Sequence, residues 1–280
     1  MPAFAGDKPA GKRRMAMGEP SMTTALITGA SAGLGEGFAR ALAADGSDLI
    51  LTARRADRLE ALAAELRGKH GTASHIIAAD LTEPAAPARL IADIAAAGLT
   101  VDTLINNAGY GLRGPVAALD PDAQLGVIDI NCRALVALAR AVLPGMIARK
   151  GGGILNVAST AAFQPGPWMA VYYASKAFVL SFSEALHEEV REHGIHVAAL
   201  CPGPTNTEFA GRAGMTDMPL FTKLASGPEA VVRDGLAALK ANQAVKISGA
   251  MNAVMAESIR FTPRALARRI AGSLQKARKG

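Results

Sequence analysis

The chain has 280 residues, half of them apolar and 19% charged, a length that corresponds to one large domain or two small ones. It contains no run of 18 apolar residues, which excludes a membrane-spanning helix. Its two cysteines, Cys132 and Cys201, exclude a disulfide scaffold and a cysteine-based structural zinc site, and we expect no metal. Aromatic residues make up only 4% of the chain, too few for a platform that stacks the bases of single-stranded nucleic acid.

The net charge of +6 resides at the two ends of the chain. Residues 1–21 have a net charge of +2, and residues 259–280 contain seven basic and no acidic side chains. The body, residues 22–258, contains 19 basic and 22 acidic side chains and therefore has a net charge of −3. A basic groove in the body is not supported, and we expect no nucleic-acid partner.

The two ends are interpreted separately from the body. Residues 1–21 lack the apolar core of a secretory signal, so we expect a solvated tail and, with only two cysteines, a cytoplasmic protein. Leu266, Ile270 and Leu274 recur every four residues among basic side chains, which predicts a basic amphipathic helix within 259–280. Such a helix packs on the domain or a second subunit, or contacts a membrane surface; we favour packing.

Short aliphatic runs alternate with longer Ala-, Leu-, Arg- and Glu-rich stretches along the body. The predicted strands are 24–28, 48–52, 74–79, 102–106, 153–158, 195–200 and 243–247. The predicted helices are 34–45, 56–68, 85–97, 121–148, 170–192 and 228–241, and we expect Pro144 to end or kink the fourth. Repeated strand–helix units predict a single α/β domain over 22–258, with a parallel sheet covered by helices on both faces.

A glycine-rich loop, TGASAGLG (28–35), connects the first predicted strand to the first predicted helix. Its glycines permit a sharp turn and a close approach of the backbone to a bulky anion. The N-terminus of the following helix offers free N–H groups and a positive dipole end to a pyrophosphate. The spacing GxxxGxG differs from the standard GxGxxG fingerprint, so the position of the loop, more than the motif itself, indicates a dinucleotide site.

The residue that follows the second predicted strand indicates which dinucleotide binds. An acidic residue there would bind the ribose hydroxyls of the adenosine and repel a 2′-phosphate, but Thr52 and Ala53 are followed by Arg54. The planar cation of Arg54 suits phosphate oxygens, so we predict NADP(H) over NAD(H); a solvated loop arginine is the alternative. Asp80 ends the third strand, where it accepts a hydrogen bond from adenine or caps a helix beginning near Glu83.

NNAG (106–109) closes the fourth predicted strand. In a sheet of order 3-2-1-4-5, the first and fourth strands flank the point where the strand order reverses. Ligands bind in the crevice at that point, at the carboxyl ends of the strands. We therefore expect residues 29–35 and 107–109 to face each other across a cofactor.

Ser159 ends the fifth strand, and Tyr172 and Lys176 lie one helical turn apart at the start of the next helix. A tyrosine with its ordinary pKa of about 10 is poorly matched to proton transfer at neutral pH, and a nearby ammonium lowers that pKa. A Tyr–Lys pair at this spacing is usually a surface pair. Tyr173 is adjacent, and spacing does not decide between the two tyrosines.

Taken together, these segments resemble a classical short-chain dehydrogenase/reductase over residues 22–250. The matching segments are TGASAGLG (28–35), DLT (80–82), NNAG (106–109), Asn131, Ser159, YYASK (172–176) and PGPTNT (202–207). The resemblance implies a Rossmann-like, doubly wound sheet of seven parallel strands. It also implies a homodimer or homotetramer formed through the helices near 121–148 and 170–192.

The resemblance implies a catalytic tetrad of Asn131, Ser159, Tyr172 and Lys176. In that family, the serine positions the carbonyl oxygen, the tyrosine transfers the proton, the lysine lowers the pKa of the tyrosine and holds the nicotinamide ribose, and the asparagine holds a water. The implied cofactor-binding residues are Gly29, Ser31, Gly33, Leu34, Gly35, Arg54, Asp80, Leu81, Asn107, Ala108, Gly109, Tyr172, Lys176, Pro202, Gly203 and Thr205. Ala32 stands where many NADP-preferring members have a basic residue, so we expect a moderate preference.

We therefore predict an NADP(H)-preferring oxidoreductase that interconverts a carbonyl and a secondary alcohol on a small, largely apolar substrate. Apolar residues that flank the tyrosine and the Pro202 segment are candidates for the substrate pocket, and core or interface positions are their alternative: Phe163, Trp168, Met169, Phe209, Met215, Met218, Pro219, Leu220 and Phe221. The alternative function is a catalytically silent NADP(H)-binding regulator or scaffold, which has no use for the Ser–Tyr–Lys set.

Overall fold

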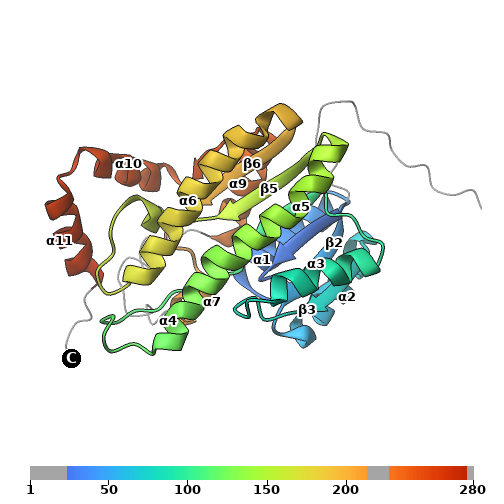
Figure 1. Ribbon diagram of the computed structural model, residues 1–280, viewed down its shortest axis with the longest axis horizontal. Coiled ribbons are helices and arrows are strands. Elements are labelled where there is room, and N and C mark those ends of the chain that lie inside the picture. The colour runs from blue at the N-terminus through green and yellow to red at the C-terminus, as the bar shows by residue number, and fades with distance from the viewer. Residues whose placement is uncertain (1–23, 213–226, 276–280) are drawn as a thin grey trace, which may run out of the picture.

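The computed structural model describes residues 24–212 and 227–275 (Figure 1). Its seven strands are all parallel and form one sheet in the order β3-β2-β1-β4-β5-β6-β7. The predicted order of the first five strands, 3-2-1-4-5, is confirmed. The strands are β1 (Thr24–Thr28), β2 (Asp48–Ala53), β3 (Ser74–Ala78), β4 (Thr103–Asn106), β5 (Gly152–Val157), β6 (Ile195–Cys201) and β7 (Val245–Ile247). The strand order reverses between β1 and β4, which is where ligands of this fold class bind.

Helices cover both faces of the sheet (Figure 1). The helices of the body are α1 (Gly33–Ala44), α2 (Ala56–His70), α3 (Ala86–Ala96), α4 (Pro121–Ile128), α5 (Leu135–Arg149), α6 (Ala170–Val190), α7 (Glu208–Arg212) and α9 (Pro228–Lys240). Two further helices follow β7: α10 (Ala250–Ser258) and α11 (Arg264–Gln275). Within the described ranges, no helix is both long enough and apolar enough to cross a bilayer.

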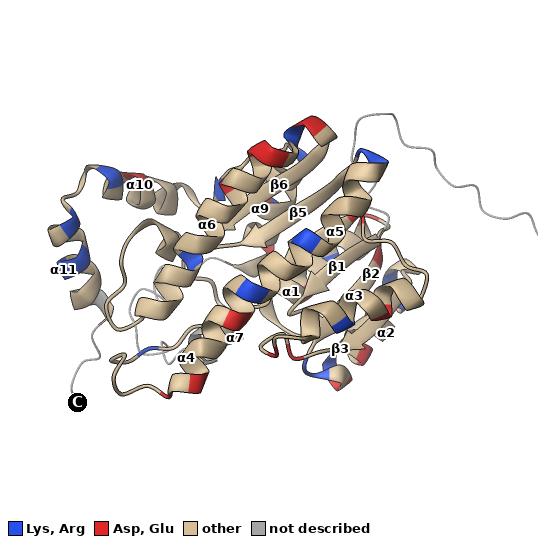
Figure 2. Ribbon diagram, viewed as in Figure 1, with Lys and Arg blue, Asp and Glu red and all other residues tan. Residues whose placement is uncertain are grey.

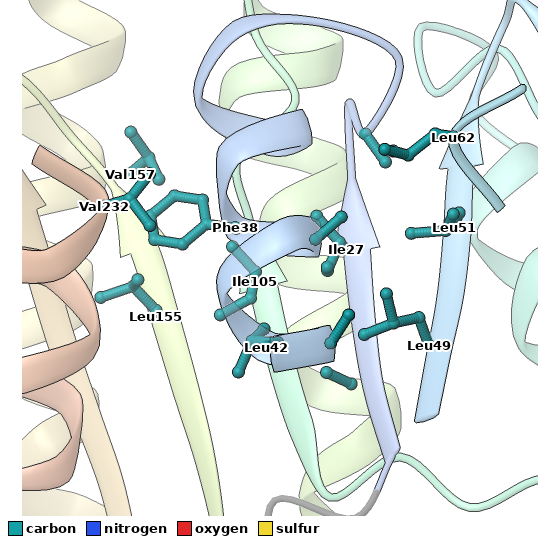
Figure 3. Close-up of a cluster of buried hydrophobic side chains, with 14 of the residues drawn as sticks. Ile27, Phe38, Leu42, Leu49, Leu51, Leu62, Ile105, Leu155, Val157 and Val232 are labelled. Carbon is teal, nitrogen blue, oxygen red and sulfur yellow. The ribbon is translucent and has the colours of Figure 1, made fainter. Parts of the chain in front are cut away.

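The strands bury both faces, because alternate residues enter two separate hydrophobic clusters. Ile27 of β1 points into a cluster with helices α1, α2 and α9, whereas Leu26 points into a cluster with α3, α5 and α6. Figure 3 shows the first cluster, in which Phe38 of α1 lies against β5 and Val232 of α9. Phe38 is fully buried, so this ring fixes α1, and with it the glycine-rich loop, on the sheet.

The long helix predicted over 121–148 is interrupted, although not by Pro144. Pro144 lies inside α5, which continues to Arg149, so Pro144 does not end the helix; a kink at Pro144 stays a prediction. The irregular segment is instead Asp129–Ala134, which forms a π-helical stretch between α4 and α5. Such stretches are rare and occur frequently at functional sites, and this one contains Asn131.

The C-terminal helix α11 lies within the predicted range, but its apolar face differs from the prediction. The side chains that α11 buries include the small residues Ala267 and Ala271, whereas Leu266 and Ile270 remain 49% and 48% exposed. The helix α11 therefore packs on the domain through its small residues, while Leu266 and Ile270 stay half exposed; packing on a second subunit remains a prediction. The side chain of Leu274 lies outside the described residues.

Truncation of Phe38 tests whether the cluster beneath α1 holds the fold together. Phe38→Ala should lower the free energy of unfolding by about 3–5 kcal/mol, because it removes a fully buried ring and leaves a cavity. Val116→Ala, at a side chain that is 56% exposed, should change it by less than about 0.5 kcal/mol. Urea unfolding followed by circular dichroism measures both, and equal effects would contradict the assignment of the core.

Candidate active site

A cavity with a volume of about 550 Å³ lies at the carboxyl ends of the strands. Its walls come from the loops that follow the first six strands and from the start of α6. The predicted site residues that line it are Gly29, Ser31, Gly33, Leu34, Arg54, Asp80, Leu81, Asn107, Ala108, Gly109, Ser159, Tyr172, Lys176, Pro202, Gly203 and Thr205. Gly35 and Asn131 do not line the cavity.

The glycine-rich loop owes its shape to close backbone contacts. Gly29 and Gly33 have φ values of +67° and +58°, the left-handed region that favours glycine. A Cβ atom on Gly35 would lie 2.2 Å from the carbonyl oxygen of Gly29, so a side chain cannot fit there. The residue that precedes α1, Ala32, provides no side-chain cap for the helix N-terminus. The N–H groups of the first turn are therefore left for an anion in the cavity.

Thr28 and Asn107 join the carboxyl ends of β1 and β4. The hydroxyl of Thr28 accepts hydrogen bonds from the backbone N–H groups of Asn107 and Ala108, at 3.0 and 2.9 Å. The side-chain amide of Asn107 donates in return to the carbonyl oxygen of Thr28 at 2.9 Å. The side chain of Asn107 therefore supports the glycine-rich loop, and the predicted opposition of the two loops across one cavity is present in the structure.

Two adjacent arginines lie at the end of β2. Arg54, the residue predicted to bind a phosphate, is 62% exposed, with its guanidinium 3.8 Å from a carboxylate oxygen of Asp80. Arg55 is held more firmly, because its Nη2 atom donates to the hydroxyl and carbonyl oxygens of Ser31, both at 3.2 Å, and to Glu208 at 3.1 Å. Both arginines line the cavity. Arg55 was not among the predicted site residues, because nothing in the sequence distinguishes two consecutive arginines that follow the same strand.

Asp80 does not cap a helix, because α3 begins only at Ala86. Its carboxylate instead accepts hydrogen bonds from the backbone N–H and the hydroxyl of Thr82, at 3.0 and 2.8 Å. Burial acts to raise the pKa of Asp80, but the two hydrogen bonds from Thr82 and the charge of Arg54 outweigh it, so the pKa is lowered. The group is thus an anionic hydrogen-bond acceptor at the cavity wall at neutral pH.

Ser159 and Tyr172 share the far end of the cavity. The hydroxyl of Ser159 accepts a hydrogen bond from the backbone N–H of Ala161 at 3.1 Å, which fixes the turn after β5. Tyr172 is only 8% exposed, and its ring lies 5.3 Å from that of Phe209, centroid to centroid. Burial raises the pKa of Tyr172, and a side-chain hydrogen bond with Ser159 acts in the opposite direction. The phenol is therefore protonated at neutral pH.

Lys176 is a buried amine beside this phenol. Its Nζ atom donates to the carbonyl oxygen of Val157 at 2.7 Å and lies 5.9 Å from the ring centroid of Tyr172. Burial lowers the pKa of Lys176 to about 8. We expected Lys176 to lower the pKa of Tyr172, but the net shift is upward, because burial of the phenol dominates and the amine points to the end of β5.

Asn131 lies behind the cavity wall. Its side chain is 1% exposed, accepts a hydrogen bond from the backbone N–H of Tyr110 at 3.2 Å and donates to the hydroxyl of Ser175 at 2.9 Å. A Cβ atom on Gly109 would lie 2.6 Å from its carbonyl oxygen, so the asparagine packs directly against the cavity-lining loop. In this arrangement the side chain braces the loop; its predicted role in holding a water remains a prediction.

Gln275, the last described residue of α11, was not predicted as a site residue either. Its amide donates to the hydroxyl of Tyr173 at 2.6 Å, and its backbone carbonyl accepts from Arg113 at 2.9 Å. Gln275 lines the cavity, and its Oε1 atom is buried with no hydrogen-bond partner within the described part of the chain. No local motif identifies this glutamine, because its position depends on how α11 folds back over the site.

Four of the nine candidate pocket residues are described. Met169 and Phe209 line the cavity, whereas Phe163 packs into a buried cluster with Leu135 and Val179. Trp168 does not line the cavity. The remaining candidates lie outside the described residues: Met215, Met218, Pro219, Leu220 and Phe221.

The cavity has the features that a dinucleotide requires. One end offers the uncapped N-terminus of α1 and two arginines for phosphate groups. Glycines with positive φ bring the backbone close to the space a pyrophosphate would fill. The other end offers hydroxyls and an amine, from Ser159, Tyr172 and Lys176, near where a nicotinamide ring would lie. The residues present therefore fit a nicotinamide dinucleotide.

Comparison with known proteins agrees with this geometry. A family model described as short chain dehydrogenase matches residues 23–217. The very-long-chain 3-oxoacyl-CoA reductase of Phaeosphaeria nodorum is 40% identical over 182 residues, which cover 64% of this chain and 53% of that protein. The reductase of the same name from Bos taurus is 34% identical over 190 residues, 66% of this chain and 60% of that protein. The match thus spans little more than half the length of these curated relatives.

A solved structure covers more of the fold. The short-chain dehydrogenase from Sphingobium yanoikuyae in complex with NADPH matches with a TM-score of 0.77 and 35% sequence identity. The match covers 87% of this chain and 94% of that chain. The similarity therefore includes nearly the whole of the other protein, with its nucleotide-binding fold.

The lowered pKa of Lys176 predicts a stability effect with a defined sign. The folded protein holds this proton less tightly than the unfolded chain, in which the lysine pKa is about 10.5. The buried ammonium therefore destabilises the fold below about pH 8, and this cost disappears as the pH rises from about 8 to about 10.5. Without added nucleotide, Lys176→Met should raise the free energy of unfolding at pH 7 by about 1–3 kcal/mol.

Urea unfolding at pH 7 and pH 10 measures this difference, which should shrink at the higher pH. Lys69→Met, at an amine that is 63% exposed, is the matched control and should differ from the unchanged chain by less than about 0.5 kcal/mol. A Lys176→Met variant less stable than the unchanged chain at pH 7 would contradict the assignment.

Proposed function

The chain belongs to the short-chain dehydrogenase family, and on that basis we propose that it is an NADP(H)-preferring oxidoreductase that interconverts a carbonyl and a secondary alcohol. A nicotinamide cofactor supplies or accepts the hydride in this chemistry. The observation that carries the proposal is the meeting of Ser159, Tyr172 and Lys176 at one end of a cavity whose other end suits phosphate groups.

Tyr172 is the proton donor in the reduction direction. Its phenol carries a proton at neutral pH, which it gives to the substrate oxygen as negative charge develops there. The Ser159 hydroxyl, which donates to the carbonyl oxygen of Pro202 at 3.4 Å in this structure, turns to donate to the same substrate oxygen and positions it. Lys176, with a pKa of about 8, is mainly an ammonium at neutral pH. Its positive charge stabilises the phenolate that remains after proton transfer, and its N–H groups suit the hydroxyls of a ribose.

Arg54 and Arg55 support the preference for NADP(H). A 2′-phosphate needs cationic donors at the end of β2, and two guanidiniums line the cavity there. Arg55 is oriented by Ser31 and Glu208, whereas Arg54 has the more exposed side chain and is paired with Asp80 only at 3.8 Å. Arg54 can therefore reorient toward a phosphate while breaking only a weak contact with Asp80. Arg55 instead holds the glycine-rich loop through Ser31.

The substrate end of the cavity supports a largely apolar substrate. Ala161, Met169 and Tyr172 form a buried cluster, with Tyr173 and Phe209 packed against it. All five line the cavity. The two curated relatives above are named for very-long-chain 3-oxoacyl-CoA substrates. We infer that a ketone on an aliphatic chain, such as a 3-oxoacyl thioester, is the substrate class, with the carbonyl oxygen directed to Tyr172.

The family likeness also suggests a second copy of the chain as partner. Exposed apolar side chains lie on α4 and α6, which pack against each other: Leu125, Ile128 and Phe178. Phe178 stacks on Phe182 one turn away, which extends the apolar surface of α6. We propose that these helices and α5 form the interface of a homodimer or homotetramer.

Removal of a single hydroxyl tests the proposed function. Tyr172→Phe should lower kcat for ketone reduction by about 10²–10⁴-fold, because the proton donor is lost, while the Kd for NADPH stays within a few-fold. Tyr173→Phe, which loses a neighbouring hydroxyl that contacts Gln275, should keep most of its activity. Steady-state kinetics at the nicotinamide absorbance and fluorescence titration with NADPH measure the two quantities.

The assay uses ketones, aldehydes and 3-oxoacyl thioesters of increasing chain length, with NADPH and NADH. An equal loss of kcat in Tyr172→Phe and Tyr173→Phe would contradict the assignment of Tyr172 as the proton donor. If the unchanged chain binds NADPH and turns over none of these compounds, the catalytically silent regulator replaces the enzyme as the function.

Cofactor preference is tested at Arg54. Arg54→Ala should weaken NADPH binding by about 10–100-fold, because a charge-assisted contact to phosphate is lost, and leave NADH binding nearly unchanged. Arg67→Ala, at an exposed arginine of α2, is the control and should alter neither. An unchanged ratio of NADPH to NADH affinity in Arg54→Ala would assign the phosphate contact to another residue.

A further inference from the structure

The segment after β7 has an unusual share of the exposed apolar surface. Six of the eleven large apolar side chains exposed within residues 24–212 and 227–275 lie in α10, the 3-10 turn Ile259–Phe261 and α11. They are Met251, Val254, Met255, Phe261, Leu266 and Ile270. Phe261 is 88% exposed. A cluster of exposed apolar side chains that includes an aromatic ring is typical of a surface that binds a partner or a membrane. We call α10, this turn and α11 the C-terminal surface.

The helices of the C-terminal surface bury small side chains and expose large apolar ones, the opposite of an ordinary amphipathic helix. Met251, Val254 and Met255 share one exposed face of α10, while the side chain that α10 buries is Ala256. On α11, Leu266 and Ile270 are about half exposed, while Ala267 and Ala271 are buried. Small residues therefore contact the domain, and large apolar residues face outward. A helix that served only its own domain would do the opposite.

Basic side chains surround these apolar residues. Arg260, Arg264, Arg268 and Arg269 are all exposed, and Glu257 is the one acidic side chain within 250–275. Figure 2 shows this basic region on α11 and at the end of α10, at one extremity of the molecule. Residues 259–280 contain no acidic side chain at all, although the body of the chain has a net negative charge.

We propose that the C-terminal surface binds the surface of a bilayer that contains anionic lipids. Apolar side chains among arginines match the acyl–headgroup boundary, where the apolar groups leave water and the guanidiniums meet lipid phosphates. A second copy of the chain is the poorer occupant, because a symmetric contact would bring two arginine-rich surfaces together. The exposed apolar residues of α4 and α6 are the separate surface assigned to that partner.

The same helices also contact the cavity, so a bilayer bound to them would lie near the site. Gln275 of α11 lines the cavity and donates to Tyr173. Asn252 of α10 packs closely on Gly203: a Cβ atom on Gly203 would lie 2.4 Å from the side-chain amide nitrogen of Asn252. A bilayer bound to the C-terminal surface is therefore next to the substrate end, where an apolar substrate of the proposed reaction would enter from lipid.

Vesicle sedimentation with the full chain tests the proposal without any assay of activity. The chain should pellet with vesicles of phosphatidylcholine mixed with phosphatidylglycerol, and much less with phosphatidylcholine alone or at high salt. Arg268→Gln/Arg269→Gln should weaken partitioning by roughly 25-fold, about fivefold for each arginine. Phe261→Ser should weaken it by at least about tenfold. Arg67→Gln and Val116→Ser, exposed residues elsewhere on the molecule, are the controls and should bind as the unchanged chain does.

Phe261→Trp adds a local readout. Its indole emission should shift to the blue on the mixed vesicles, relative to the background of Trp168, the single tryptophan of the chain. The proposal is overturned if the unchanged chain stays in the supernatant, or if both variants of the C-terminal surface bind as tightly as the controls. If the variants instead lower the molar mass measured by light scattering and leave vesicle binding unchanged, a second copy covers this surface and the proposal fails.

Discussion

The junction between the ends of β1 and β4 determines where everything else in the site lies. Two hydrogen bonds between Thr28 and Asn107, and a third from the N–H group of Ala108 to Thr28, close it at the point where the strand order reverses. Because the two strands diverge into helices on opposite faces, a crevice opens directly above this junction. The glycine-rich loop then reaches its shape through contacts with Asn107 and Ala108, and neither would form if β1 and β4 were not adjacent.

The buried amine of Lys176 lowers the stability of the fold, because burial disfavours its charged form. Burial lowers the pKa of Lys176 to about 8, and its ammonium donates a hydrogen bond to the carbonyl oxygen of Val157 at the end of β5. A protein retains a buried charge at such a cost when function needs it. The neighbouring phenol of Tyr172 is shifted in the direction that keeps it protonated. The pair therefore places a protonated phenol beside an ammonium, which is the arrangement that the proposed proton transfer requires.

The sequence predicted the sheet well because buried parallel strands appear as short, continuous apolar runs, and the seven predicted ranges match the observed strands within about two residues. Predictions that depend on tertiary contacts were less successful. Pro144 is accommodated inside α5, since one helix position can lose its N–H bond when packing compensates. Arg55 and Gln275 could not be recognised, because their roles come from residues 24 and 102 positions away. The pKa of Tyr172 depends on burial, which spacing along a helix does not reveal.

The central claim is that one cavity holds a nicotinamide dinucleotide with its reactive end beside Tyr172. A crystal structure of the chain with NADPH bound tests it most directly. The claim predicts phosphate density at the N-terminus of α1 and at Arg54, with the nicotinamide within reach of the Tyr172 hydroxyl. A nucleotide bound elsewhere, or bound with its nicotinamide end turned away from Tyr172 and Lys176, would contradict it.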